Sequence, residues 1–240
     1  MSKKIFFFHN PKAGGTSIRH AIEEHYPDLN RAPLIENDIG DHARLAGQYA
    51  EFAGSEYYAG HYGRDVFDAV NDGHICITNF RHPVVRLLSL YNYFRYSVKL
   101  GADQLAEDRF YAVALARAVH FSDFLADNDP RVTVYTCNQH FRQLTNSPWS
   151  LSKNHDLHSA IKFIDQMRWY YVCEHPELSM LWFQLAIGIP AISRRNVTGV
   201  AATSDMLDGA TVRLLIRRNA LDMQLYEYAV NRLLKRIDLQ

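Results

Sequence analysis

The stretch from Ile5 to Ile18, with the sequence IFFFHNPKAGGTSI, constrains this chain more than any other part. Its continuous apolar run Ile5–Phe8 predicts a short strand that is covered on both faces. A turn with two glycines follows, and the small hydroxyl residues Thr16 and Ser17 are suited to cap the start of a helix. A strand, a tight turn and a helix in this order aim free backbone N–H groups and the positive helix end at one point. The stretch therefore predicts an anion-binding turn, for which phosphate is the usual occupant.

The position of the lysine separates this turn from the ATP-binding loop of many kinases. That loop has the pattern G-x-x-x-x-G-K-[ST], with lysine after the second glycine, whereas Lys12 precedes both glycines here. Gly14 and Gly15 would let the backbone approach a ligand with no Cβ in the way. A plain strand–turn–helix start with an incidental lysine is the alternative interpretation. The residues expected to bind the anion are Lys12, Ala13, Gly14, Gly15, Thr16 and Ser17.

A second junction between a strand and a helix lies further along the chain. The run HICITNF predicts a buried strand over His74–Phe80, and Pro83 suits the first turn of the helix that follows. Arg81 stands at the carboxyl end of the strand, where ligands of open parallel sheets bind, and it can fork onto a phosphate. Ser89 lies roughly 9 Å along the helix and could add a hydroxyl donor. Arg86 is on the same face of this helix as Ser89. It is either a further phosphate ligand or an arginine that is solvated or paired within the protein.

These two junctions carry a resemblance to a known family. The order P-K-x-G-G-T-S from Pro11 resembles the 5′-phosphosulfate loop of sulfotransferases that use 3′-phosphoadenosine 5′-phosphosulfate. The pattern R-x-P-x-x-R-x-x-S-x-Y from Arg81 resembles their 3′-phosphate motif. Gly60-His61-Tyr62 is similar to the G-H-[FY] element of the branch that contains carbohydrate O-sulfotransferases, the heparan sulfate 2-O-sulfotransferase type. Asn138–Leu144 resembles a further family stretch loosely. The resemblance is strong at the two phosphate motifs and loose elsewhere.

The resemblance implies a reaction and a set of residue roles. The enzyme would use 3′-phosphoadenosine 5′-phosphosulfate as co-substrate, with no metal, and would transfer its sulfuryl group in line to a hydroxyl acceptor, most simply a carbohydrate. Lys12 would stabilise the leaving phosphate and the glycine turn would hold the 5′-phosphate. Arg81 and Ser89 would hold the 3′-phosphate, and His61 would be the general base.

The chemistry of histidine supports a base at His61, because the ordinary pKa of an imidazole lies near neutrality. The chain has 12 histidines, but Gly60 and a strand end place His61 in the loop layer where ligands bind. A histidine hydrogen-bonded to the loop backbone is the other interpretation. Glu36, Asp38 and Asp65 could orient His61 or supply the base themselves.

The acceptor surface is expected from residues 28–60 and 97–155, which are irregular and rich in aromatic side chains. Trp149 is the predicted sugar-stacking residue. Arg142 is expected to contact an anionic acceptor or to pair with an acid. His9, beside the turn, is expected to be structural.

Composition excludes several classes of protein. The 240 residues carry 26 basic and 26 acidic side chains, a balance that argues against a general nucleic-acid binder. Three cysteines lie far apart, which predicts neither a disulfide framework nor a zinc knuckle. The N-terminal apolar run is too short for a signal peptide, and no run reaches the roughly 18 apolar residues of a membrane span. We therefore expect a soluble, cytoplasmic protein without stable membrane insertion, either bacterial in type or trimmed of the anchor that Golgi carbohydrate sulfotransferases carry.

The order of elements predicts the fold class. Strands alternating with helices imply an α/β fold with a P-loop-like parallel sheet of about four to five strands, flanked by helices and followed by a helical C-terminal portion, in a single domain over 1–240. The predicted strands are 5–8, 57–62, 74–80 and 169–173. The predicted helices start near 16, then cover 41–52, 84–96, 104–118, 121–125, 138–145, 156–167, 176–185, 205–218 and 221–237.

Two other functions compete with sulfuryl transfer. A small-molecule kinase of related design would need the missing G-K-[ST] and a magnesium-holding aspartate after an apolar strand, and no clear one is present. A non-catalytic nucleotide-binding module would keep Lys12 and Arg81 but would need no base at His61.

Overall fold

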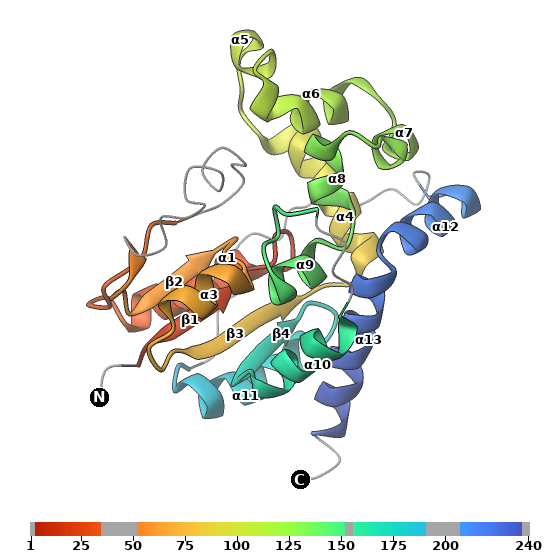
Figure 1. The fold of residues 1–240 in the computed structure, drawn as a ribbon. Helices are drawn as coiled ribbons and strands as arrows, with labels where there is room; N and C mark the ends of the chain where they lie inside the picture. The colour runs from red at the N-terminus through yellow and green to blue at the C-terminus, as the bar shows by residue number, and fades with distance from the viewer. Residues whose placement is uncertain (1–2, 35–51, 152–155, 191–206, 237–240) are drawn as a thin grey trace.

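The computed structural model describes residues 3–34, 52–151, 156–190 and 207–236. Its centre is a parallel sheet with the strand order β2-β1-β3-β4 (Figure 1). The strands are β1 (Ile5–Phe8), β2 (Tyr57–Gly60), β3 (Ile75–Phe80) and β4 (Trp169–Val172). Helices flank the sheet and form the C-terminal portion, so the predicted α/β fold class is confirmed, with four strands in the described residues.

The register of the strands brings the carboxyl ends of three of them to one edge of the sheet. Phe8 at the end of β1 lies opposite Gly60 of β2 on one side and Thr78 of β3 on the other. The chain leaves β1 toward β2 but leaves β3 toward β4, on the other side of the sheet. Such a divergence between neighbouring strands is a topological switch point, and ligands of open α/β sheets bind outside the carboxyl ends of the strands there. The two sequence junctions fall on these two strands.

One face of the sheet is covered by α1 (Gly15–His25) and α11 (Pro176–Ile187). Because successive side chains of a strand point to opposite faces, Ile5 and Phe7 of β1 both face these helices and pack in one buried cluster with Ile22 of α1. The apolar run of β1 is therefore covered on this side as the sequence predicts.

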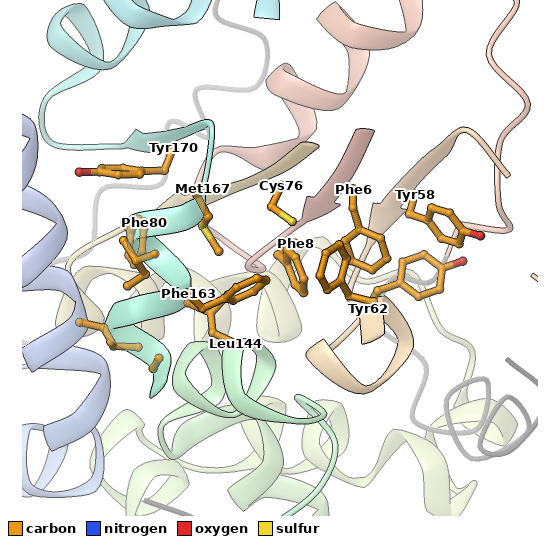
Figure 2. Close-up of a cluster of buried hydrophobic side chains, with 14 of the residues drawn as sticks. Phe6, Phe8, Tyr58, Tyr62, Cys76, Phe80, Leu144, Phe163, Met167 and Tyr170 are labelled. Atoms are coloured by element: carbon orange, nitrogen blue, oxygen red, sulfur yellow. The ribbon is translucent and has the colours of Figure 1, made fainter. Parts of the chain in front are cut away.

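The other face is covered by a larger set of helices. Phe6 and Phe8 belong to a cluster that extends to the far strand through Phe80 and Tyr170 (Figure 2). The helices that supply its outer half are α3 (Arg64–Val70), α9 (Gln139–Thr145), α10 (Leu157–Gln166) and α13 (Ala220–Lys235). Both faces of β1 are thus buried, which fixes the position of the turn that follows it.

A separate helical lobe stands beyond the carboxyl edge of the sheet (Figure 1). It has its own buried cluster around Leu87, Phe94 and Phe124. Its elements are α4 (Pro83–Asn92), the π-helix η2 (Tyr93–Ser97), α5 (Ala102–Leu105), the 3₁₀ helix η3 (Asp108–Phe110), α6 (Tyr111–Ala118), α7 (Phe121–Ala126), α8 (Pro130–Thr136) and α12 (Gly209–Arg218). Helix α4 joins this lobe to β3, so the second junction links sheet and lobe.

Several predicted helix boundaries were wrong. The helix predicted over 84–96 ends at Asn92 and continues as a π-helix, in which the N–H of Val98 donates to the carbonyl of Tyr93 over 3.0 Å. The helix predicted over 104–118 is interrupted by η3. Helix α8 was not predicted; it begins at Pro130, and Asp129 caps it by accepting from the backbone N–H of Arg131. Helix α3 was not predicted, and the helix predicted over 41–52 lies almost wholly outside the described residues.

Candidate functional site

The turn after β1 is built from two residues in the left-handed region. Lys12 has φ 64° and Gly14 has φ 79°, which reverses the chain within a few residues. Helix α1 then begins at Gly15, with Gly14 in the N-cap position and no side-chain cap from the described residues. The expectation that Thr16 or Ser17 caps the helix was therefore wrong, because both lie inside its first turn. That turn contains no acidic residue, so its backbone N–H groups and helix dipole favour an anion.

Asn79, which the sequence analysis did not single out, holds this turn. Its side chain is fully buried at the end of β3. Its Oδ1 accepts from the backbone N–H of Asn10 over 2.8 Å, and its Nδ2 donates to the carbonyls of Asn10 over 3.0 Å and Ala13 over 2.8 Å. A polar residue inside the otherwise apolar run HICITNF was the available clue, because buried amides need partners.

Arg81 joins the two junctions directly. Its Nη1 donates to the backbone carbonyl of Lys12 over 3.0 Å, and the side chain is only partly buried. The remaining guanidinium donors are held beside the lysine turn at the switch point of the sheet. The structure therefore brings Lys12 and Arg81 to one place.

The Lys12 ammonium lies against an aromatic ring of the helical lobe. Its Nζ is 4.0 Å from the centroid of the Tyr93 ring, a cation–π distance. Burial, and to a smaller extent the charge of Arg81, lower the pKa of Lys12 to about 8. Tyr93 is the first residue of the π-helix, so the irregular end of α4 presents this ring to the lysine.

His61 lies directly after β2, where Gly60 has φ 140°. Its side chain is 3% exposed, and its ring centroid lies 5.2 Å from that of His9 and 6.0 Å from that of Trp149. It therefore sits at the same edge of the sheet as the lysine turn. Of the carboxylates predicted to orient it, Asp65 lies in the first turn of α3 with Oδ1 close to Gly63, whereas Glu36 and Asp38 lie outside the described residues.

Gln143 of α9 connects the loops that carry the two histidines. Its Nε2 donates to the backbone carbonyl of His9 over 3.3 Å and to that of Tyr62 over 2.9 Å. The side chain is buried. This amide fixes the spacing between the end of β1 and the end of β2, and the loose family resemblance over residues 138–144 gave no role for it.

The other predicted phosphate ligands on α4 differ from each other. Ser89 is half-buried on the helix that follows Arg81. Arg86 is 1% exposed, with Nη1 donating to Oε1 of Gln139 over 3.0 Å and Nη2 to the carbonyl of Tyr135 over 3.4 Å. Of the alternatives for Arg86, the structure shows a buried arginine paired with protein groups.

Two predictions about the acceptor surface were wrong. The Arg142 guanidinium is buried and donates to the backbone carbonyls of Val134, Cys137, Pro148 and Ser150, so it braces a loop instead of meeting an acceptor or an acid. Trp149 is 9% exposed and packs beside Tyr135, with ring centroids 5.7 Å apart, so it offers no open face to a sugar.

The family-like stretch from Asn138 helps to hold the C-terminal helices. The Asn138 Oδ1 accepts from the N–H groups of Leu221 and Asp222, and Asp222 in turn accepts from the N–H groups of His140 and Phe141. The starts of α9 and α13 thus cap each other. The residues in this part of the family-like stretch therefore make packing contacts between helices that support the site.

Neither a metal cluster nor a membrane span is found in the part of the chain that the structure describes. No three His, Cys, Asp or Glu side chains there are grouped so that they could hold a metal ion. Within the same residues, no helix has the length and apolar character needed to cross a membrane. The expectation of a metal-free reaction stays a prediction.

Comparison with known proteins assigns this chain to no family. No protein-family model matches the chain, and no match was found among curated protein sequences. The function is therefore inferred from the residues of the site.

Proposed function

We propose that this protein is a sulfotransferase that moves a sulfuryl group from 3′-phosphoadenosine 5′-phosphosulfate to a hydroxyl acceptor, with a carbohydrate as the favoured class. The observation that carries the proposal is the 3.0 Å contact between Arg81 Nη1 and the carbonyl of Lys12. It brings together two basic junctions from neighbouring parallel strands, at the point of the sheet where ligands bind. A nucleotide with phosphates at both its 5′ and 3′ positions needs two such sites side by side.

The residues present fit this donor. Among the described residues, the start of α1 has no acidic residue and no side-chain cap, so this helix end suits an anion. The first turn of α4 has no acidic residue of its own, but Glu174 accepts from the N–H of His82 over 3.0 Å there, so Arg81 is the main anion-binding group at this junction. In the proposal, Lys12 and the amides of residues 13–17 hold the 5′-phosphate. Arg81 and Ser89 hold the 3′-phosphate, which separates this donor from one with a single phosphate group.

In the proposed reaction, the protein would contribute the positive charge of Lys12 and the general base His61. When bound, the donor supplies an activated sulfuryl group on its 5′-phosphate. Lys12 would stabilise the negative charge that grows on the departing phosphate oxygen, since fixed cations act strongly where charge develops. His61 would accept the proton of the attacking hydroxyl. The predicted cytoplasmic location belongs to the proposal, supported by the free thiols of Cys76, Cys137 and Cys173.

His61→Ala is expected to reduce transfer without reducing donor binding. Loss of the base should lower turnover by about 100-fold or more. Calorimetric affinity for adenosine 3′,5′-bisphosphate should change little, because His61 is assigned no phosphate contact. Transfer is measured with sulfur-labelled donor and a panel of neutral and uronic-acid-containing oligosaccharides, in the absence of magnesium. His158→Ala on the exposed surface of α10 is the matched control.

The same experiment separates the competing functions. Normal turnover in His61→Ala would remove the base from this residue. Tight binding of the bisphosphate with no transfer to any acceptor by the wild-type protein would favour a non-catalytic module. Preferential binding of ATP with magnesium would favour a kinase.

A further inference from the structure

His9 occupies a buried position between the proposed base and the anion turn. It follows the last residue of β1 and is 5% exposed. Its ring stacks on Phe7 with centroids 5.3 Å apart and an interplanar angle of 16°. The His61 ring lies 5.2 Å away at 58°. The ring of His9 is therefore held in one orientation from two sides.

The packing on the third side of the His9 ring explains why residue 15 is a glycine. A Cβ atom placed on Gly15 would lie 2.0 Å from Cδ2 of His9 and 2.3 Å from Nε2, which no packing tolerates. Gly15 has no positive φ, so its backbone does not need glycine. The missing side chain of Gly15 makes room for the histidine ring, and the expectation that Gly15 also lets a ligand approach stays a prediction. The Nε2 edge of His9 thus faces the first residue of α1.

The surroundings determine where the proton of His9 sits. Nδ1 is buried and has no hydrogen-bond partner among the described residues. A proton on Nδ1 would be a buried donor without a partner, which is unfavourable, so the neutral ring carries its proton on Nε2. Burial first, and then the charges of His61, Arg19 and Lys12, lower the pKa of His9 well below 6.5. His9 is therefore a neutral ring at physiological pH.

We propose that His9 is a binding residue of the anion site, whose Nε2–H donates to an oxygen of the group being transferred. The identity of that group as sulfuryl rests on the proposed function. The geometry favours this group over the 5′-phosphate. The base His61 must stand next to the attacking hydroxyl, and the start of α1 must stand next to the phosphate. His9 lies between His61 and Gly15. Its N–H therefore faces the group that lies between the attacking hydroxyl and the 5′-phosphate, which is the sulfuryl group. The two adjacent histidines then have different tasks, a neutral donor and a base.

The test compares two ligands that differ by the sulfuryl group. His9→Phe keeps a ring between Phe7 and His61 but removes the N–H. Its calorimetric affinity for 3′-phosphoadenosine 5′-phosphosulfate is expected to fall about tenfold or more, as for loss of a hydrogen bond to a charged group. Its affinity for adenosine 3′,5′-bisphosphate should stay within about threefold. A purely structural role for His9 would lower both affinities together, and that result would overturn the proposal.

A second measurement uses the unchanged protein, in case the variant does not fold. Nitrogen-15 NMR of the His9 imidazole should show the proton on Nε2, and the Nε2–H resonance should shift saturably when inorganic sulfate is added. A proton on Nδ1, or no shift with sulfate, would contradict the proposal. If sulfate shifts this resonance but neither nucleotide binds, the contact stands and the proposed function fails.

Discussion

Lys12→Ala is expected to lower sulfuryl-transfer turnover about 100- to 1000-fold, the range found when one preorganised charge-stabilising group is removed. The Lys12 ammonium lies over the Tyr93 ring, and the Arg81 guanidinium donates to the backbone carbonyl of Lys12. No other residue in the proposal supplies a cation for the departing phosphate oxygen. The measurement is steady-state turnover with saturating labelled donor.

The backbone should survive this change. Lys12 already has φ 64°, and alanine carries the same Cβ, so the strain of the left-handed conformation is the same in both proteins. Melting temperature should therefore change little. Lys162→Ala, at an exposed position of α10, is the control for loss of a lysine. Full activity of Lys12→Ala would contradict its role.

The lowered pKa of Lys12 gives the same variant a second readout. Because its pKa is about 8, the ligand-free amine loses its proton as pH rises through that value, and a phosphate binds the protonated form better. Affinity of the wild type for adenosine 3′,5′-bisphosphate should therefore decrease above pH 8, by at most about tenfold per pH unit. In Lys12→Ala the decrease should be absent. Parallel profiles in the two proteins would show that Lys12 does not contact the nucleotide.

Asn79→Ala is expected to destabilise the fold and to remove nucleotide binding. It leaves the N–H of Asn10 and the carbonyls of Asn10 and Ala13 without the partners they have now. Each buried group left unpaired costs about 1–3 kcal/mol, so after some relaxation the free energy of unfolding should fall by roughly 3 kcal/mol. Without Asn79 the left-handed turn at Lys12 has lost its main side-chain support.

Urea unfolding measures the first effect and calorimetry the second. Asn128→Ala, at an exposed position after α7, should change the free energy of unfolding by less than about 0.5 kcal/mol. An Asn79→Ala protein with wild-type stability and affinity would show that the turn is held by other contacts.

The strands and the two junctions could be predicted from the sequence because their determinants are local. The run at Ile5–Phe8 needs only its own apolar residues to indicate a covered strand, and the structure has the strand with the same bounds. Pro83 likewise marks the start of α4. After Asn92 the helix continues as a π-helix, and no residue in the sequence marks that change as Pro83 marks a helix start.

The contacts that shape the site could not be predicted because they depend on the folded backbone, over short as well as long separations along the chain. Asn79 reaches Asn10 across 69 positions. Gly15 was expected to let a ligand approach, but the His9 ring that also needs the space beside it could not be foreseen. Arg142 has the charge of an acceptor ligand, but its partners are backbone carbonyls that only the fold brings together. Charge and residue type predict a class of partner, and the fold decides which partner is in reach.

The central claim is that the lysine turn and the arginine junction bind the two phosphates of one nucleotide. The most direct test is calorimetric titration, without magnesium, of the wild type and Arg81→Ala with adenosine 3′,5′-bisphosphate and adenosine 5′-phosphate. Arg81 also supports the turn through the carbonyl of Lys12, so the ratio of the two affinities is compared. We predict that the wild type prefers the bisphosphate by about tenfold or more, and that Arg81→Ala loses this preference. Equal binding of the two nucleotides by the wild type, or an unchanged ratio in Arg81→Ala, would contradict the claim.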